Sequence, residues 1–265
     1  MNISAVIITD NWDEKMKRCV KSVEWCGELI IIEDKHVESR IKNYELSLPA
    51  QAGIKNNNVG IYQRDLNNDF GKQRNYGLEK AKGDWVLFVD SDEEVSRELR
   101  KEITTKPQIS ECVGFYFKRQ DCFMGRWLKH GEVGEMKLLR LAKKNAGRWR
   151  GCVHETWDIK GPTAVLENPL HHYPHPTITE FLEKINCYTD IVAQSWKEEG
   201  RKIHGWEIIL YPLGKFLQNY LWKLGFLDSF PGLVMAVMMS FHSFLARSKY
   251  WIINSTVGRS LHSPD

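Results

Sequence analysis

Two carboxylates stand one residue apart in Asp90-Ser91-Asp92, directly after the apolar run WVLFV. Both can turn toward a single hard cation, because the chain leaves extended geometry at the end of a strand. Oxygen ligands of this kind suit Mg²⁺ or Mn²⁺, and such ions commonly bridge to a diphosphate. The ion would neutralise charge on a leaving nucleoside diphosphate. Asp-x-Asp also occurs by chance in solvated turns, so the tripeptide needs support from its surroundings.

A second acidic pair, Glu33-Asp34, ends another apolar run. A carboxylate at a strand end can accept hydrogen bonds from a nucleobase or a ribose. The alternative is that these residues are exposed loop acids.

Lys72 and Arg74 open a helix-like segment, and phosphate oxygens favour helix N-termini and nearby cations. Lys72 is the preferred phosphate ligand, because the sequence does not fix which way Arg74 faces. Both could equally be solvent-facing charges.

The segment RGCVHETWD places His154 and Glu155 between the aromatic residues Trp149 and Trp157. Apolar surroundings raise the pKa of a carboxyl group. A partly buried glutamate therefore suits a general base that takes a proton from a hydroxyl. The alternative is a structural His-Glu pair that caps a turn.

Three histidines, His171, His172 and His175, fall within the segment LHHYPHP. An imidazole is a good additional ligand for a Mn²⁺ already held by carboxylates. The alternative is a histidine packed against Tyr173. The chain shows no Ser-His-Asp order and no Gly-x-x-x-x-Gly-Lys run, so the hydrolase and P-loop classes lose support.

Four short apolar runs alternate with helix-like stretches over the first hundred residues: SAVIITD, ELIIIED, VGIYQRD and WVLFVD. Such runs are typical of parallel strands covered on both faces. We expect an α/β nucleotide-binding fold with a mostly parallel central sheet. Ligands of these sheets lie beyond the carboxyl ends of the strands, where both acidic groups are found. Residues from about 112 to 173 are more antiparallel in character, with short runs between glycine-containing turns.

The composition changes after Pro174, and we expect a catalytic domain over residues 1–175 and a helical C-terminal region over 176–265. The segment FPGLVMAVMMSFHSFLA has about 17 mostly apolar residues, which is at the lower limit for a bilayer-spanning helix. A core helix or an interfacial anchor fits this length better.

The overall composition indicates a folded protein, with 42% hydrophobic and 27% charged residues. A net charge of +3 is too small to imply nucleic-acid binding, although it suits an anionic membrane surface. The six cysteines are scattered without zinc-like spacing, and the N-terminus lacks the features of a secretory signal. We therefore expect a cytoplasmic protein with free thiols.

In order and spacing, four stretches resemble family 2 glycosyltransferases of the GT-A fold: SAVIITDN, ELIIIED, GKQRNYGLEKAKGDWVLFVDSDEE and RGCVHETWDIKGPTAVLENPLHHYPH. More narrowly, the chain resembles bacterial lipopolysaccharide-core glucosyltransferases that add a β-linked glucose to a heptose. The stretches run from residue 3 to about 175, and the helical tail around KINCYTD is similar too.

The resemblance implies a metal-dependent inverting enzyme that uses Mn²⁺ or Mg²⁺. The enzyme would move a sugar, expected to be glucose, from a UDP-sugar to a saccharide or glycolipid acceptor such as a lipopolysaccharide core or another cell-surface glycan. It would work at the inner face of the cytoplasmic membrane as a peripheral protein. Asp92 and His172 would hold the metal, and Glu155 would deprotonate the acceptor hydroxyl. The residues implied in donor binding are Thr9, Asn11, Glu33, Asp34, Lys72, Asp90 and Ser91; Asp90 would approach the ribose.

Two departures from the family pattern bear on the nucleoside. An Asp and a Ser/Gly-rich turn usually follow the second strand, whereas this chain reads Glu33-Asp34-Lys35-His36, and the stretch from 37 to 58 is longer than expected.

Two other functions are alternatives to a glycosyltransferase. A nucleotidyltransferase usually has a Gly-rich basic loop after the first strand, where this chain has the acidic TDNWDEK. A catalytically inactive nucleotide-sugar-binding module would require Asp92 or Glu155 to be dispensable.

Overall fold

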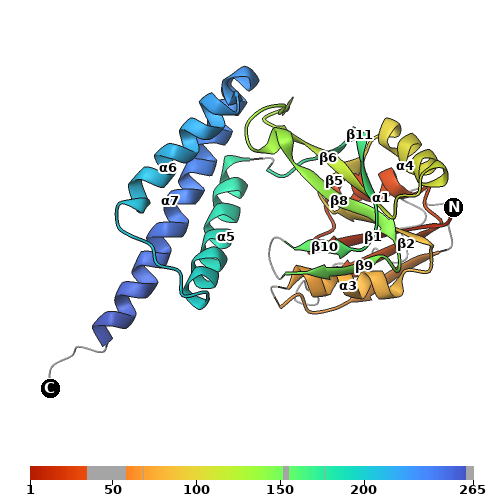
Figure 1. Ribbon diagram of the computed structural model, residues 1–265, viewed down its shortest axis with the longest axis horizontal. Helices are drawn as coiled ribbons and strands as arrows, with labels where there is room; N and C mark the ends of the chain where they lie inside the picture. Colours follow the sequence, from red (N-terminus) through yellow and green to blue (C-terminus); the bar gives the residue numbers. More distant parts are fainter. Residues whose placement is uncertain (35–57, 68, 152–154, 176, 261–265) are drawn as a thin grey trace. The chain divides into compact units, whose positions relative to one another are not determined.

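The structure is a computed structural model that describes residues 1–34, 58–67, 69–151, 155–175 and 177–260 (Figure 1). The long stretch from 37 to 57 and His154 therefore lie outside the described residues. The chain forms two compact units. The first contains Met1–Gln120 and Met136–Tyr173, and the second contains Asp121–Glu135 and Pro174–Asp265.

Four parallel strands form one half of the sheet in the first unit, in the order β3 (Val59–Gln63), β2 (Glu28–Glu33), β1 (Ile3–Thr9) and β4 (Trp85–Asp90). In the register of these strands, Thr9 pairs with Glu33 and Ile8 pairs with Asp90. The carboxyl ends of β1, β2 and β4 therefore meet at one edge. This arrangement brings together the two acidic groups that the sequence placed at strand ends.

Antiparallel strands extend the sheet beyond β4 and bring the total to nine. They are β8 (Lys137–Lys143), β6 (Gly114–Phe123), β11 (Thr163–His172) and β5 (Glu93–Val95), with β7 (Arg126–Trp127) paired to the end of β6. The α/β class is as predicted, and the sheet is mixed instead of mostly parallel, because the antiparallel runs of the middle segment join it through β8. A separate two-stranded sheet contains β9 (Gly147–Arg150) and β10 (Thr156–Ile159).

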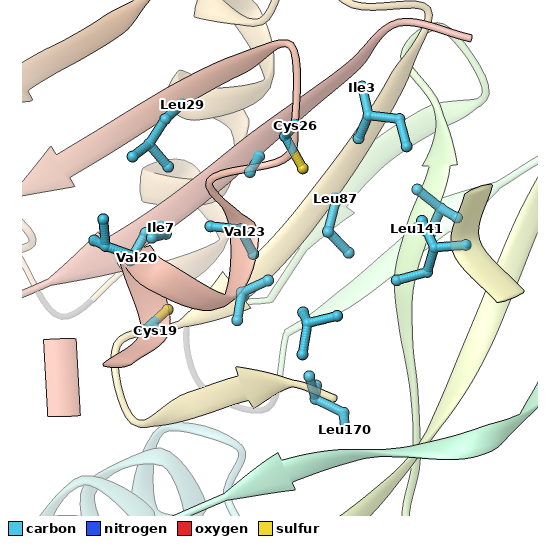
Figure 2. Close-up of a cluster of buried hydrophobic side chains, with 14 of the residues drawn as sticks. Ile3, Ile7, Cys19, Val20, Val23, Cys26, Leu29, Leu87, Leu141 and Leu170 are labelled. Carbon is cyan, nitrogen blue, oxygen red and sulfur yellow. The ribbon is translucent and has the colours of Figure 1, made fainter. Parts of the chain in front are cut away.

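Both faces of the parallel strands are buried, which explains why their sequences are apolar throughout. On one face, side chains such as Ile7 and Leu87 pack with α1 (Glu14–Val23) and α4 (Arg97–Ile109) (Figure 2). On the other face, Val6 and Phe88 pack with α3 (Phe70–Lys80) and with the two-stranded sheet. A Cβ at Gly77 of α3 would lie 2.4 Å from Val6 Cγ1, so this helix can approach β1 closely only because Gly77 has no side chain.

The second unit consists of α5 (Ile178–Glu198), α6 (Glu207–Leu217), the short π-helix η2 (Gln218–Trp222), the 3₁₀ turn η3 (Gly225–Asp228) and α7 (Ser229–Ser260), together with residues 121–135. Phe123 and Leu128 share a buried cluster with Phe181 of α5 and Met235 of α7. The predicted boundary at residue 175 assigned the 121–135 segment to the first domain, whereas its packing groups it with the C-terminal helices.

Side-chain oxygens of η2 and η3 hold the 121–135 segment in the second unit. The Asp228 carboxylate accepts hydrogen bonds from the backbone N–H of Lys129 (3.0 Å) and of His130 (2.8 Å), and it lies 3.0 Å from His130 Nδ1. Asn219 Oδ1 accepts from the Glu132 N–H at 2.9 Å. These bonds satisfy backbone donors of the irregular stretch that follows β7.

One helical stretch, Gly225–Ser255, is long and apolar enough to cross a bilayer by length and composition, with a mean hydropathy of 1.4. A core helix of a soluble protein meets the same criterion. α7 extends well beyond the segment of about 17 residues identified in the sequence, and Met235, Met238 and Tyr250 on it belong to buried clusters.

Candidate active site

The ends of β1 and β2 carry four of the residues predicted to contact the nucleoside. Thr9 is buried, and its Oγ1 accepts from the Asn11 N–H at 3.1 Å while donating to the Asn11 carbonyl at 2.6 Å. Glu33 is also buried, and its Oε2 accepts from Gln63 Nε2 at 3.2 Å. Asn11 is exposed and Asp34 is half-buried. The more accessible members of this group are therefore Asn11 and Asp34, and the buried ones shape the strand ends.

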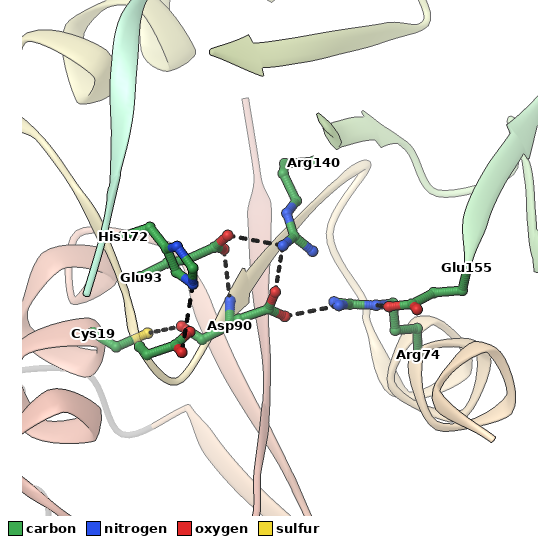
Figure 3. A network of polar contacts seen from close by, with 8 residues as sticks. Cys19, Arg74, Asp90, Glu93, Arg140, Glu155 and His172 are labelled. Atoms are coloured by element: carbon green, nitrogen blue, oxygen red, sulfur yellow. Dashed lines mark hydrogen bonds and ion pairs between the residues drawn. The ribbon is translucent and has the colours of Figure 1, made fainter. Parts of the chain in front are cut away.

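A buried network of charges lies at the end of β4 (Figure 3). Asp90 Oδ1 accepts from Arg74 Nη2 at 2.8 Å, and Asp90 Oδ2 is hydrogen-bonded to Arg140 Nη2. Arg140 Nη2 also donates to Glu93 Oε1 at 2.9 Å, and Glu93 Oε2 accepts from the Asp90 backbone N–H at 2.9 Å. The network therefore ties β4, β5, β8 and α3 together at the carboxyl edge of the sheet.

The charges in this network determine each other's protonation. Burial disfavours the ionised form of Asp90, but the guanidinium groups of Arg140 and Arg74 outweigh it and hold the pKa of Asp90 well below its usual range. Burial raises the pKa of Glu93, against the opposing effect of Arg140, and the nearby Asp90 carboxylate raises it further. Asp90 is thus the permanently charged carboxylate around which the two arginines are fixed.

Arg74 is buried and Lys72 is exposed, which settles the direction of Arg74 that the sequence left open. Arg74 is 5% exposed and lies on the buried face of α3 with Gly77 and Leu78, three and four residues later. Its guanidinium also lies 4.7 Å from the centroid of the Trp149 ring. The Lys72 side chain is 71% exposed and pairs with Asp69 Oδ2 at 2.9 Å. Arg74, not Lys72, is therefore the cation that α3 contributes to the network.

Glu155 is joined to this network through Arg74. Its Oε1 accepts from Arg74 Nε at 2.7 Å, and its side chain is 14% exposed. The aromatic surroundings predicted from the sequence are present nearby, since Trp149 and Trp157 stack with ring centroids 5.3 Å apart. These surroundings also hold the Arg74 cation, which the sequence did not predict as a neighbour of Glu155. One guanidinium therefore bridges the predicted base to Asp90.

Asp92 and His172, the predicted metal ligands, lie together on the other side of Asp90. His172 Nε2 is 3.5 Å from Asp92 Oδ2, and the Tyr173 N–H donates to the Asp92 carbonyl at 2.9 Å. This proximity arises because β11 pairs with β5, which places His172 opposite Glu93. His171 pairs opposite Glu94, and successive residues of a strand point to opposite faces. His172 is therefore the histidine next to Asp92. Ser91 is half-buried in the turn between β4 and β5.

Within the part of the chain that the structure describes, no group of three or more His, Cys, Asp or Glu side chains is arranged to hold a metal ion. Asp92 and His172 supply one carboxylate and one imidazole. That pair fits an ion that keeps several waters and takes further oxygens from a substrate diphosphate, as Mg²⁺ commonly does. The residues are compatible with a metal held jointly by protein and donor.

Arg140 and Glu93 complete the network and were not identified from the sequence. Arg140 stands alone in the apolar run LLRLA of β8, and this isolated charge in a buried strand is the signal that could have found it. Glu93 follows Asp92 directly and is 1% exposed. Among four acids within the five residues 90–94, the sequence does not show which carboxylate turns inward.

The chain matches one family model and is similar to several glycosyltransferases. The model of the family described as "Glycosyl transferase family 2" matches residues 4–156. The lipopolysaccharide core biosynthesis glycosyltransferase LpsC of Rhizobium meliloti is 23% identical over 257 residues, covering 94% of this chain and 92% of that protein. An uncharacterised glycosyltransferase of Rickettsia prowazekii is 23% identical over 262 residues, covering 93% and 86%. Among solved structures, Staphylococcus aureus TarS (residues 1–349) in complex with UDP-GlcNAc has a TM-score of 0.47 and 14% identity, covering 94% of this chain and 88% of that chain.

Proposed function

The chain belongs to glycosyl transferase family 2, and from this membership we propose that it is an inverting enzyme with Glu155 as its general base. The observation that carries the proposal is the bridge from Glu155 through Arg74 to Asp90. A base must be held in place to accept a proton during the reaction, and this bridge fixes the Glu155 carboxylate with respect to the end of β4.

The proposed reaction is a single in-line displacement. The acceptor hydroxyl oxygen forms a bond to the anomeric carbon of the donor sugar, its proton passes to the Glu155 carboxylate, and the bond from that carbon to the diphosphate oxygen breaks. Attack opposite the leaving group inverts the anomeric configuration. Arg74 is a positioning residue in this scheme, because it contacts the base and not the reacting atoms.

The donor is proposed to be a UDP-sugar, with glucose as the expected sugar. Asn11 and Asp34 are accessible at the strand ends and are proposed to contact the uridine, with Thr9 and Glu33 supporting them from beneath. The resemblance placed Asp90 against the ribose, but both its carboxylate oxygens contact arginines. We therefore assign Asp90 to holding Arg74 and Arg140. Lys72 is exposed at the start of α3 and stays a candidate for binding the donor diphosphate. Ser91 also stays a candidate for donor binding.

Asp92 and His172 are proposed to hold a Mn²⁺ or Mg²⁺ ion together with the donor diphosphate. Such an ion supplies positive charge that stabilises the leaving nucleoside diphosphate. The support is the 3.5 Å separation of the two side chains beside the Asp90 network.

The acceptor is proposed to be a saccharide of a lipopolysaccharide core or another cell-surface glycan. The support is the name of the R. meliloti relative, which spans nearly the same length as this chain. An acceptor of this class would place the enzyme at the inner face of the cytoplasmic membrane.

The test of the catalytic proposal is Glu155→Gln, which keeps the shape of the side chain and removes the proton acceptor. Transfer from UDP-glucose in the presence of Mn²⁺ should fall by about 10²–10⁴-fold in kcat, with the donor KM little changed. Glu79→Gln is the matched control, because Glu79 is a half-exposed glutamate that pairs with Arg148 at the surface. Unchanged kcat in the Glu155 variant, or an equal loss of kcat in both variants, would show that Glu155 is not the general base. Assaying the wild-type enzyme with a panel of UDP-, GDP- and TDP-sugars identifies the nucleobase and the sugar of the donor.

A further inference from the structure

Residues 206–230, all of them described, form an unusually apolar part of the second unit's surface. Twelve large apolar side chains in this segment are exposed. Ile209, Leu213 and Leu217 recur every four residues along α6, and each is more than half exposed. Side chains at this spacing lie on one face of a helix. The face continues past α6 with Trp222, which is 87% exposed. Runs of this kind mark an interaction surface, unlike single exposed apolar residues.

Within residues 201–230, the charges at the surface are of one sign, although Glu198 and Glu199 are exposed just before this segment and Glu132 pairs with Lys215 at 2.8 Å. Glu207 and Asp228 are the acidic residues of 201–230, and both are buried. Glu207 Oε1 accepts from the His204 N–H at 2.9 Å, and Asp228 is bonded to the hairpin of residues 121–135. Arg201 and Lys202 are exposed at the start of the segment. The surface of residues 201–230 therefore presents apolar and cationic side chains without an exposed carboxylate.

The length of α6 and the packing of α7 argue against a membrane-spanning arrangement. α6 has 11 residues, whereas a helix needs about 20 to cross the hydrocarbon core of a bilayer. α7 is long enough, but Met235 and Met238 pack against the 121–135 hairpin and α5, and Tyr250 belongs to a second buried cluster. Inserting α7 would empty both clusters. A surface that is apolar and cationic, on helices that stay packed, fits the plane of a lipid interface.

We propose that residues 201–230 form a docking surface for an anionic phospholipid bilayer, with α6 lying in the interface. The apolar face of α6 and Trp222 enters the boundary between headgroups and acyl chains, and Arg201 and Lys202 contact anionic headgroups. This assigns the membrane contact to the segment that precedes α7, and the assignment does not depend on which sugar or acceptor the enzyme uses.

The test measures co-sedimentation of the full-length chain with vesicles of phosphatidylcholine alone or mixed with phosphatidylglycerol. Ile209→Gln is compared with Ile109→Gln, because Ile109 is an isoleucine of the first unit that is 80% exposed and the exchange is identical. Wild-type protein and the Ile109 variant should bind the anionic vesicles more tightly than the neutral ones. Ile209→Gln should bind about tenfold more weakly, because one large apolar side chain no longer enters the interface.

Three outcomes would overturn the proposal. Equal vesicle binding by the two isoleucine variants would show that α6 does not face the lipid. Resistance of the membrane-bound protein to an alkaline carbonate wash would indicate a spanning helix. Self-association in sedimentation equilibrium that Ile209→Gln abolishes, without vesicle binding by the wild-type chain, would assign the surface to a second copy of this chain. UDP-sugar hydrolysis is measured on the same samples and should be equal in all of them, so a failed transferase assignment is recognised separately.

Discussion

Folded proteins usually bury apolar side chains and expose charged ones, and each of the two units departs from this rule in a different way. The first unit buries charge, with Arg74, Arg140 and Glu93 each at most 5% exposed. The second unit exposes apolar surface, with Ile209 at 63% and Trp222 at 87%. Buried charges and exposed apolar runs are the informative exceptions in a folded protein. In the first unit, ion pairs compensate the loss of hydration. In the second, the described residues leave the apolar segment exposed, and the proposed lipid surface would cover it.

Arg140→Met should give the largest loss of stability, because it leaves Glu93 buried without its cation and leaves the half-buried Asp90 with Arg74 alone. Breaking a buried ion pair from one side costs about 3–5 kcal/mol. The change is measured as the free energy of unfolding in urea, followed by circular dichroism. Arg148→Met is the control, since the Arg148 side chain is 68% exposed and its pair with Glu79 should contribute no more than about 1 kcal/mol. Similar losses in the two variants would contradict a buried network.

Arg74→Lys should reduce kcat by about 100-fold, an effect typical of a misplacement near 1 Å in an active site. Lysine keeps the positive charge, but its single ammonium cannot reproduce the separate Nε and Nη2 bonds to Glu155 and Asp90. The donor KM should change far less than kcat, which a general loss of folding would not produce. Arg150→Lys, at an exposed pair with Asp158, should leave both constants unchanged. Full activity of the Arg74 variant would show that charge alone is sufficient there.

Asp228→Ala tests buried polar contacts in the second unit. It removes the acceptor for two backbone N–H groups of the 121–135 hairpin and the partner of His130 Nδ1. Leaving buried donors unsatisfied costs about 1–3 kcal/mol, which thermal and urea unfolding can resolve. Asp190→Ala is the control, because the Asp190 side chain is 62% exposed where it pairs with Lys249. An unchanged unfolding free energy for Asp228→Ala would show that apolar packing alone holds the hairpin.

Ile209→Gln should have the smallest effect on stability, within about 0.5 kcal/mol of the wild-type chain. Its side chain is mostly exposed, so the folded state loses little packing. Ile185→Gln makes the same exchange at a position that is 3% exposed in the second unit and should destabilise the protein clearly. If Ile209→Gln were as damaging as Ile185→Gln, the α6 face would be covered in solution and the contrast between the two units would disappear.

The sequence predicted the elements of the parallel half and their acidic ends well, because strands buried on both faces are apolar throughout. It could not predict that Arg140 faces Asp90. That contact depends on the pairing of β8 with β4, in which Leu141 lies opposite Leu87, and the sequence offers no local signal for it. The same limit applies to Arg74, whose direction is set by the close approach of Gly77 to Val6.

The C-terminal region shows a different limit. The predicted helical region over 176–265 includes residues 206–226, but helical spacing alone does not distinguish a face covered by the protein from one left exposed. For a related reason, the sequence did not indicate that residues 121–135 pack with the C-terminal helices. Their strand-like pattern resembles the neighbouring β6 and β8, and only the distant partners Asp228 and Met235 reveal where they pack.

The interrupted second unit sets an order in which the protein can fold during synthesis. The His130 N–H finds its acceptor on Asp228, 98 residues later in the chain. β8 to β11 follow residues 121–135 and complete the first unit by Tyr173, whereas residues 121–135 must wait until α6, η3 and α7 have left the ribosome. Contacts at such sequence separations form slowly. We therefore expect the C-terminal helices to pack last, and a chain that stops before α7 would lack the Met235 and Met238 side chains that cover Phe123 and Phe181.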